Sequence, residues 1–410
     1  MAILDSLREF SADMRSQRLR TTLTVLGITW GTVAVVVLLA FGVGLENQTR
    51  KRFHGLGDRI VILFGGRTTE AYAGFREGRW IQLRAEDATL LRSEIPDITM
   101  ISPEYSDRTT PVRRGRSSST PNITGIHPVY GIMRNIIPEL GGRFVNGRDL
   151  EDRRRVIFLG DEIAGLLFGD EDPVGSEVFV GEVPFTVIGV MRPKLQSSSY
   201  NSRDKDRVFI PASTYEALFG DVYVNNFVYR TSGAQNTKAV ERRVYEVLGS
   251  KYRFNPEDED ALGVWDTAEF EKLFGYMFLG FKIFFGIVGG FTLTVGGIGV
   301  ANIMYIVVRE RTREIGVKRS VGARRGDILR QFLAETFFVV AIGAVFGFLA
   351  SVGLVKLLSL VPMQDFVGTP TISGTVMTVT LVLLGLVGIM AGIFPARKAA
   401  NLDPVECLRY

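Results

Sequence analysis

Apolar residues in this chain gather into four long runs, and most polar residues lie between the first run and the second. The runs are Leu23–Leu45, Leu279–Val308, Phe332–Val361 and Val376–Phe394. Each reaches the roughly 20 residues that an α-helix needs to cross the hydrocarbon core of a bilayer. A soluble core does not readily bury four such runs. The pattern therefore predicts an integral membrane protein with four transmembrane helices.

The long polar stretch between the first two runs predicts a mixed α+β domain outside the cytoplasm. Short runs of β-branched and aromatic residues predict strands at Arg59–Leu63, Val156–Leu159, Glu177–Val180, Phe185–Val190, Arg207–Ile210 and Asn226–Tyr229. Helices are predicted at Arg84–Ser93, Glu162–Phe168, Ser213–Leu218 and Gln235–Leu248. We expect a variable insert near 95–150, and mobile loops at Arg113–Pro121 and Gln196–Asp206, which are rich in Ser and Arg.

Charge fixes the predicted orientation. The connection at 309–331 carries eight Lys or Arg residues and three acids, and short basic connections stay in the cytoplasm. Both termini are then cytoplasmic and the α+β domain is external. The predicted organisation is an amphipathic surface helix at 1–20, a first span with a stalk at 21–58, the external domain at 59–270, a stalk with the second span at 271–308, the basic loop at 309–331, spans at 332–361 and 372–395, and a tail at 396–410.

The basic loop has a pattern of its own, which predicts a short surface helix from Arg311 to Val321, a turn at Gly322-Ala323 and a new helix near Asp327. Its composition fits a solvated loop that only orients the protein. Its interspersed apolar residues equally fit a docking element for a cytoplasmic partner. In the spans, small residues four apart predict close helix packing. These pairs are Gly27 with Gly31, Gly286 with Gly290, Gly343 with Gly347, and Gly388 with Gly392.

The chemistry of an enzyme is not evident in this sequence. It contains no Gly-x-x-x-x-Gly-Lys-Ser/Thr phosphate loop, and its two histidines, His54 and His127, do not suggest a metal cluster. We therefore predict no catalytic, cofactor-binding or metal-binding residues and no nucleic-acid partner. The single Cys407 excludes an intramolecular disulfide.

Four segments together resemble the MacB/FtsX-type ABC transporter permeases. They are RSQRLRTTLTVLGITWG at 15–31, VIFLGDEIAGLLFGDEDPVGSEVFVGEVPFTVIGVM at 156–191, RTREIGVKRSVGARRGDILRQFLAET at 311–336 and PARKAANLDPVECLRY at 395–410. The resemblance implies a bacterial inner-membrane permease that dimerises with itself or a paralogue. It also implies a separate cytoplasmic ABC ATPase that holds the ATP and Mg²⁺, a periplasmic adaptor with an outer-membrane duct, and contact with membrane lipids.

The resemblance further implies that the basic loop couples the permease to the ATPase. The coupling residues would be Arg311, Arg313, Glu314, Ile315, Gly316, Val317, Lys318, Arg319, Val321, Gly322 and Ala323. A bulky charged residue at Ile315 or Gly316 is expected to uncouple the ATPase without unfolding the external domain. The implied function is export of a drug, peptide or lipid-like molecule by mechanotransmission. Release of lipoproteins, control of a cell-wall hydrolase in the manner of FtsX, and a simple membrane anchor remain alternatives.

Overall fold

The computed structural model of the chain describes residues 18–57, 59–196, 199–233, 237–360, 368–403 and 407. The surface helix predicted at 1–20 lies almost wholly outside these residues. The chain forms two compact units. One comprises Met1–Thr49 and Gly275–Tyr410, and the other comprises Arg50–Phe274. We call them the membrane unit and the outer domain.

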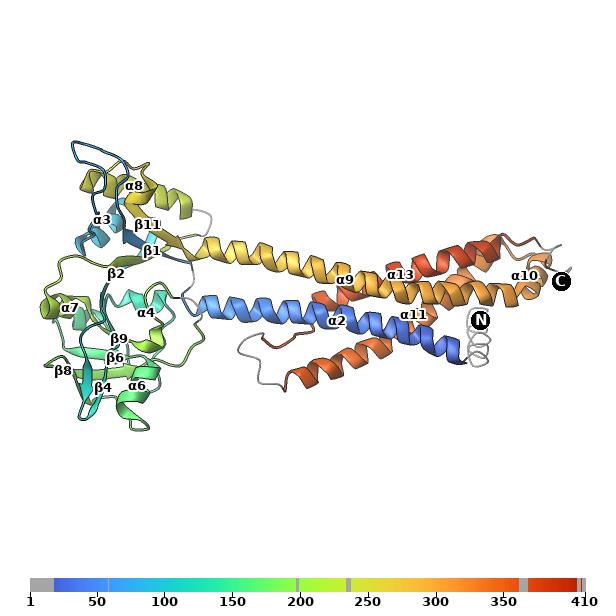
Figure 1. Cartoon of the computed structure of the whole chain (residues 1–410), viewed down its shortest axis with the longest axis horizontal. Helices are drawn as coiled ribbons and strands as arrows, with labels where there is room; N and C mark the ends of the chain where they lie inside the picture. Colours follow the sequence, from blue (N-terminus) through green and yellow to red (C-terminus); the bar gives the residue numbers. More distant parts are fainter. Residues whose placement is uncertain are drawn as a thin grey trace. The chain divides into compact units, whose positions relative to one another are not determined.

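Among the described residues, four long helices are apolar enough, by length and composition, to cross a membrane. They are α2 (Arg18–His54), α9 (Thr267–Glu310), α11 (Arg325–Leu358) and α13 (Gly374–Ala400), shown in Figure 1. At a rise of about 1.5 Å per residue, α2 and α9 are far longer than the roughly 30 Å core of a bilayer. Both helices therefore continue beyond a membrane span, as the sequence predicts. Within the membrane unit they are joined by Lys282 Nζ and Glu46 Oε2, 2.5 Å apart.

Helices of the membrane unit approach most closely at glycines. A Cβ placed on Gly31 would lie 3.0 Å from the Cα of Leu293, so α2 and α9 almost touch along their backbones. Two more predicted glycines lie where α11 meets α2, and a Cβ on Gly347 would lie 2.5 Å from Thr32 Cβ. Other predicted glycines also lie at helix contacts. Gly27 joins α2 to α9, Gly343 joins α11 to α2 beside Gly347, and Gly388 and Gly392 join α13 to α11.

One predicted glycine pair is not a packing pair within this chain. In the described residues, a Cβ on Gly286 would meet no atom within 4 Å, and one on Gly290 would meet only Leu383, at 3.9 Å. The close approaches on α9 are instead at Gly289, Gly296 and Gly297. A helix rich in glycine offers several spacings of four, and the sequence does not reveal which of them faces a neighbour.

The outer domain is built on one mixed sheet of eleven strands in the described residues, ordered β11-β1-β10-β2-β5-β9-β6-β8-β7-β3-β4. The strands are β1 (Ile60–Gly65), β2 (Ile98–Asp107), β3 (Val112–Arg114), β4 (Ser117–Ser119), β5 (Asn122–Ile126), β6 (Val156–Leu159), β7 (Glu177–Val180), β8 (Val183–Val190), β9 (Arg207–Pro211), β10 (Asn226–Thr231) and β11 (Leu262–Asp266). Pairs β5–β9 and β6–β8 are parallel and the other pairs are antiparallel.

Apolar side chains cover both faces of this sheet. Side chains alternate along a strand, so Val61 and Leu63 enter one core while Ile60 and Ile62 enter the other. The helices of the outer domain are α3 (Glu86–Glu94), α4 (Val129–Met133), α5 (Gly147–Glu151), α6 (Asp161–Phe168), α7 (Ala212–Phe219) and α8 (Thr237–Tyr252), with 3₁₀ turns η1 (Asp204–Asp206) and η2 (Glu259–Ala261). Residues of α3, α6, α7 and α8 join the first core, and residues of α4 join the second.

One expectation about this domain is wrong. The stretch Arg113–Pro121 is not a mobile loop, because it lies in a β3–β4 hairpin that begins at Val112 and pairs with β7. Residues near 95–150 supply β2 and β5, which lie in the middle of the sheet, and the variable insert expected there stays a prediction. Residues 199–206, within the second predicted loop, contain the fully buried Asp204. Ser-rich and Arg-rich composition resembles a loop, but here long-range pairing decides the structure.

Candidate docking site at helix α10

The basic connection between α9 and α11 folds as the sequence predicts. Helix α10 spans Thr312–Ser320 and follows α9 after a short break at Arg311. At its end Gly322 has φ +107°, a conformation that favours glycine. Its N–H donates to Arg319 O and that of Ala323 to Lys318 O, which closes the helix in a Schellman motif. Helix α11 begins at Arg325, where the Asp327 carboxylate accepts the backbone N–H of Arg324 at 3.0 Å.

One face of α10 is turned toward its own chain. Ile315 is 3% exposed and belongs to the apolar core of the membrane unit. A Cβ placed on Gly316 would lie 2.5 Å from Cys407 Cβ, so only glycine leaves room for the tail. Arg319 Nη1 donates to the carbonyl of Ala400 at 2.7 Å, at the carboxyl end of α13. A cation at this position also suits the helix dipole of α13.

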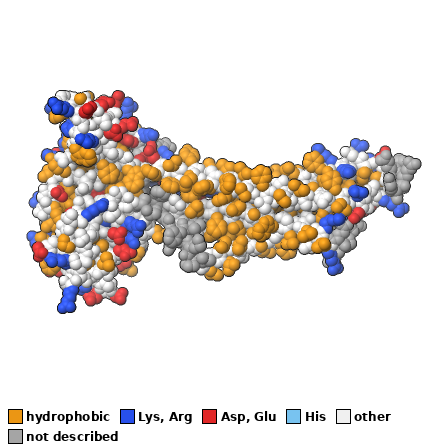
Figure 2. Space-filling view, viewed as in Figure 1, with side chains coloured by type: hydrophobic (Ala, Val, Ile, Leu, Met, Phe, Trp, Pro, Cys, Tyr) orange, Lys and Arg blue, Asp and Glu red, His pale blue; other side chains and the backbone are white. Residues whose placement is uncertain are grey.

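The opposite face of α10 is exposed. Val317 is 47% exposed and Val321 is 84% exposed, and they lie one turn apart. Exposed arginines lie near these valines in the sequence, at Arg313 on the same helix and at Arg324, Arg325 and Arg330 beyond the turn. Figure 2 shows Lys and Arg side chains gathered at the end of the membrane unit that carries α10. We call Arg313, Val317, Ser320 and Val321 the outer face of α10.

The structure therefore divides the predicted coupling residues. Arg313, Val317, Val321 and Gly322 are exposed, whereas Ile315 and Gly316 are buried. Arg311 and Arg319 bond within the chain, Lys318 pairs with Glu314 at 2.6 Å, and Ala323 packs on the apolar core. Ile315 and Gly316 lie on the face of α10 that packs inward, as one face of a surface helix must, and their role in coupling stays a prediction. These two residues hold the outer face in place.

A buried ion pair beside α10 could not be found by sequence reasoning. Arg311 Nη1 lies 3.2 Å from Glu335 Oε1, and their side chains are 9% and 1% exposed. Gln331 Nε2 also donates to Glu335 Oε1, at 3.1 Å. The one signal in the sequence is a carboxylate near the start of a strongly apolar helix, where a charge needs a partner. Nothing in the sequence identifies that partner as Arg311.

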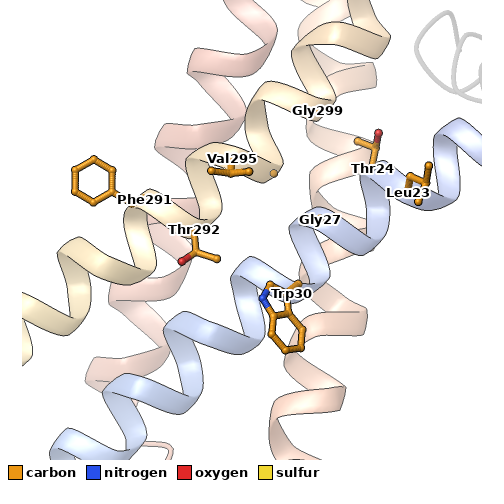
Figure 3. A pocket seen from close by; sticks show the side chains of 9 residues that line it. Leu23, Thr24, Gly27, Trp30, Phe291, Thr292, Val295 and Gly299 are labelled. Carbon is orange, nitrogen blue, oxygen red and sulfur yellow. The ribbon is translucent and has the colours of Figure 1, made fainter.

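A groove lies between α2 and α9, away from α10. It is an open depression of about 620 Å³ lined by Leu23, Thr24, Gly27, Trp30, Phe291, Thr292, Val295, Gly296 and Gly299. Figure 3 shows Trp30 and Phe291 projecting from their helices at this place. Trp30, Phe291 and Val295 are each 71% exposed. Such side chains on a membrane helix meet lipid or another protein.

The outer domain holds a second, larger set of buried charges. Arg207 and Arg134 are fully buried, with Arg207 Nη1 2.7 Å from Glu104 Oε1 and Arg134 Nη2 2.6 Å from Asp204 Oδ1. Lys194 Nζ lies 2.7 Å from Asp204 Oδ2. Tyr200 and Asn226 donate to Glu104 Oε2, so both oxygens of the Glu104 carboxylate have partners. We call Glu104, Arg134, Lys194, Asp204 and Arg207 the outer-domain ion cluster.

The three cations of this cluster keep the Asp204 carboxylate ionised. Burial alone would raise the pKa of Asp204, but Arg134, Lys194 and Arg207 hold that pKa well below its usual range. Burial lowers the pKa of Lys194, and Asp204 opposes this effect. Because these groups come from β2, β9 and the loops after α4 and β8, the cluster fixes several segments of the domain to one another. In the described residues, no three His, Cys, Asp or Glu side chains are grouped as metal ligands.

Two family models together match most of the chain. The model of the MacB-like periplasmic core domain matches residues 21–247, and the model of the FtsX-like permease C-terminal region matches residues 286–404. The chain belongs to the MacB/FtsX-type permease family. The first match contains α2 and most of the outer domain, and the second contains α10, α11 and α13.

Curated relatives of this permease agree. The "Macrolide export ATP-binding/permease protein MacB" of Bdellovibrio bacteriovorus is 31% identical over 100% of the chain, which covers 62% of that protein. MacB of Acinetobacter baylyi is 33% identical over 96% of the chain and 58% of its own length. The "Pyoverdine export ATP-binding/permease protein PvdT" of Pseudomonas syringae is 31% identical over 99% of the chain and 61% of its own length. The chain thus spans about 60% of the length of these relatives.

Solved structures similar to the permease include outer domains. The periplasmic region of MacB from Actinobacillus actinomycetemcomitans aligns with a TM-score of 0.43 and 21% identity, covering 55% of this chain and 96% of that one. The extracellular domain of YknZ from Gram-positive bacteria aligns with a TM-score of 0.41 and 18% identity, covering 50% and 99% of the two chains.

Proposed function

We propose that this chain is the permease of a MacB-like ABC transporter, which exports a drug, peptide or lipid-like molecule by mechanotransmission. The observation that carries the proposal is the two-sided construction of α10. Its inner face is fixed to the membrane unit, while its outer face presents Val317 and Val321 in a basic frame. A partner that binds this face can therefore move the helices behind it.

The partner in this proposal is a cytoplasmic ABC ATPase that binds ATP and Mg²⁺. The outer face of α10 favours a shallow apolar groove with an acidic rim, because Val317 and Val321 need an apolar surface and the surrounding arginines need opposite charge. Basic residues at this end support a cytoplasmic location for α10 and both termini in this proposal. The outer domain then lies in the periplasm, where an adaptor and an outer-membrane duct would complete the export route.

Long helices supply the mechanical connection in this proposal. Helix α9 runs without interruption from Thr267 to Glu310, directly before the start of α10. Helix α2 accompanies it, with close contacts at Gly31 and Gly289. ATP-driven closure of two ATPases would displace α10, and the stalks of α2 and α9 would carry that displacement to the outer domain.

A dimer of permeases is part of the proposal. The exposed Trp30, Phe291 and Val295 beside the α2–α9 groove offer a second copy an apolar surface at which small residues permit close approach. Trp30→Ala is expected to lower the cross-linked dimer fraction in nanodiscs. An unchanged fraction would place the dimer contact elsewhere.

ATPase stimulation tests the proposed function. The full chain is reconstituted in lipid nanodiscs with the candidate ATPase, and the rate of ATP hydrolysis is measured against ATPase alone. We expect the wild-type chain to stimulate hydrolysis and Val321→Asp to abolish most of the stimulation, since an acid then faces the acidic rim. The control is Val222→Asp, on an outer-domain valine that is 58% exposed. A wild-type chain that neither binds nor stimulates the ATPase would overturn the proposal.

A further inference from the structure

The inner side of α10 is attached at a place where two transmembrane helices meet the cytoplasmic loop. Arg311 stands between α9 and α10, and its guanidinium reaches Glu335 on the third turn of α11. Both side chains are almost completely buried. A charge buried in an apolar setting is costly without its partner, so this pair opposes separation of α10 from α11.

A second attachment joins the other end of α10 to α13. Arg319 Nη1 donates to Ala400 O at 2.7 Å and to Leu402 O at 3.4 Å. Between the two attachments, Cys407 of the tail lies against Gly316 and is only 2% exposed. Helix α10 is thus fixed to α11 at its start and to α13 at its end, in addition to its chain connection to α9.

The hydrogen bonding of the Arg311–Glu335 pair indicates that the pair positions α10 on α11 more than it stabilises the fold. Glu335 Oε1 receives both Arg311 and Gln331, whereas the buried Oε2 has no hydrogen-bond partner in the part of the chain that the structure describes. An unpaired buried carboxylate oxygen lowers stability. An apolar contact would join two helices without that cost, but it would not fix their register as a directed ion pair does.

We propose that Arg311 and Glu335 are positioning residues that make α10 and α11 move as one body. Displacement of α10 is then delivered to the third and fourth spans, α11 and α13, as well as to α9. This inference rests on the proposed coupling function, and it concerns how motion leaves α10, not how a partner binds it. Neither residue belongs to the outer face, so their loss should leave docking intact.

Four variants of the full chain test the pair in nanodiscs: Arg311→Glu, Glu335→Gln, Gln331→Ala and the exchange Arg311→Glu/Glu335→Arg. ATPase is titrated against each variant, which separates the maximal stimulation from the ATPase concentration at half-stimulation. We expect the two single charge changes to lower maximal stimulation about fivefold or more, with the half-stimulating concentration unchanged. The exchanged pair should recover a large part of the loss, and Gln331→Ala should cause a smaller loss.

The matched control exchanges an exposed ion pair of the outer domain, Arg113→Glu/Glu182→Arg, whose side chains are 43% and 90% exposed. It should leave stimulation unchanged. Reaction of Cys407, the only cysteine of the chain, with a maleimide reports whether the tail still covers Gly316. If Cys407 reacts faster with maleimide in a charge variant than in the wild-type chain, the tail has been displaced in that variant. The maximal stimulation by Gln331→Ala, which removes one hydrogen bond and no charge, then decides the test.

Three results would overturn the inference. They are unchanged maximal stimulation in the folded variants, an increased half-stimulating concentration with an unchanged maximum, and an exchanged pair no better than the single changes. Failure of the wild-type chain to stimulate the ATPase is a different outcome, because it overturns the proposed function itself. If the wild-type chain stimulates the ATPase and the pair variants stimulate it equally well, only the positioning role is overturned.

Discussion

The membrane unit and the outer domain hold their helices and strands together by opposite means. In the membrane unit, helices approach most closely at glycines, which have no side chain, as at Gly31, Gly343 and Gly347. In the outer domain, the fully buried side chains include large ones with polar groups, such as Arg134 and Arg207. The membrane unit depends on close approach of helix backbones, and the outer domain depends on ion pairs between buried side chains.

The difference follows from the two solvents. In lipid, apolar surfaces gain little from meeting each other, so helices associate through close packing and hydrogen bonds. In water, burial of apolar surface supplies about 25 cal/mol per Å² and can offset the cost of burying charges that are fully paired. Steric changes should therefore damage the membrane unit, and changes of charge or pH should damage the outer domain.

The largest effect is expected from Arg207→Met, which leaves Glu104 buried without its cation. Breaking one partner of a buried pair costs about 3–5 kcal/mol. Unfolding of the purified chain, followed by hydrogen exchange in the outer domain, measures this loss. Arg243→Met is the control, because Arg243 is 52% exposed and pairs with Glu246, which is 44% exposed. It should cost about 1 kcal/mol or less. Equal losses of unfolding free energy in the two variants would contradict a stabilising role for the outer-domain ion cluster.

A smaller effect is expected from Gly347→Leu in the membrane unit. Its Cβ would lie 2.5 Å from Thr32 Cβ and 2.8 Å from Thr29 O, so α2 must shift away from α11. Overpacking of this kind costs about 1–3 kcal/mol. Gly353→Leu on the same helix is the matched control, because a Cβ there meets nothing within 4 Å. Unfolding in detergent by titration with sodium dodecyl sulfate measures both. Similar stability of the two variants would contradict a steric basis for packing.

Elements defined by local pattern could be predicted from the sequence. The strands Val156–Leu159 and Glu177–Val180 were predicted with the bounds observed, and the α10–α11 turn at Gly322 was predicted from its glycine. These segments carry their own signals, namely runs of apolar residues and glycine at a position with positive φ. The same holds for the four long apolar helices.

Features that depend on distant partners could not be predicted. Strand β2 reads ITMISPEYSD, and its proline and charges argue against a central strand. Glu104 is tolerated there because Arg207 and Asn226 satisfy it from 103 and 122 residues away. The two faces of α10 show the same limit, because only the position of the tail reveals that Gly316 points inward.

Acid should weaken the outer domain through the ion cluster. The folded-state pKa of Asp204 lies well below its usual range, whereas the unfolded carboxyl titrates near 3.9. The stabilisation is therefore present above about pH 4 and is lost as pH falls. Between pH 5 and pH 3 this one group should account for a loss of about 1 kcal/mol. Asp204→Asn should show a shallower decline over the same range when outer-domain unfolding is followed by hydrogen exchange. Parallel pH profiles would contradict its role.

The smallest effect is expected from His127, just after β5. Burial lowers the pKa of this imidazole, and Glu216 opposes the shift only in part. Below about pH 6.5 the unfolded chain binds a proton that the folded domain resists, so stability falls as pH decreases. We expect a loss of less than about 1 kcal/mol between pH 7.5 and pH 5.5 in the wild-type chain. His127→Gln should remove it while leaving the steeper loss below pH 4, which belongs to Asp204. A variant with the wild-type profile in this window would show that the imidazole binds its proton as readily in the folded domain as in the unfolded chain.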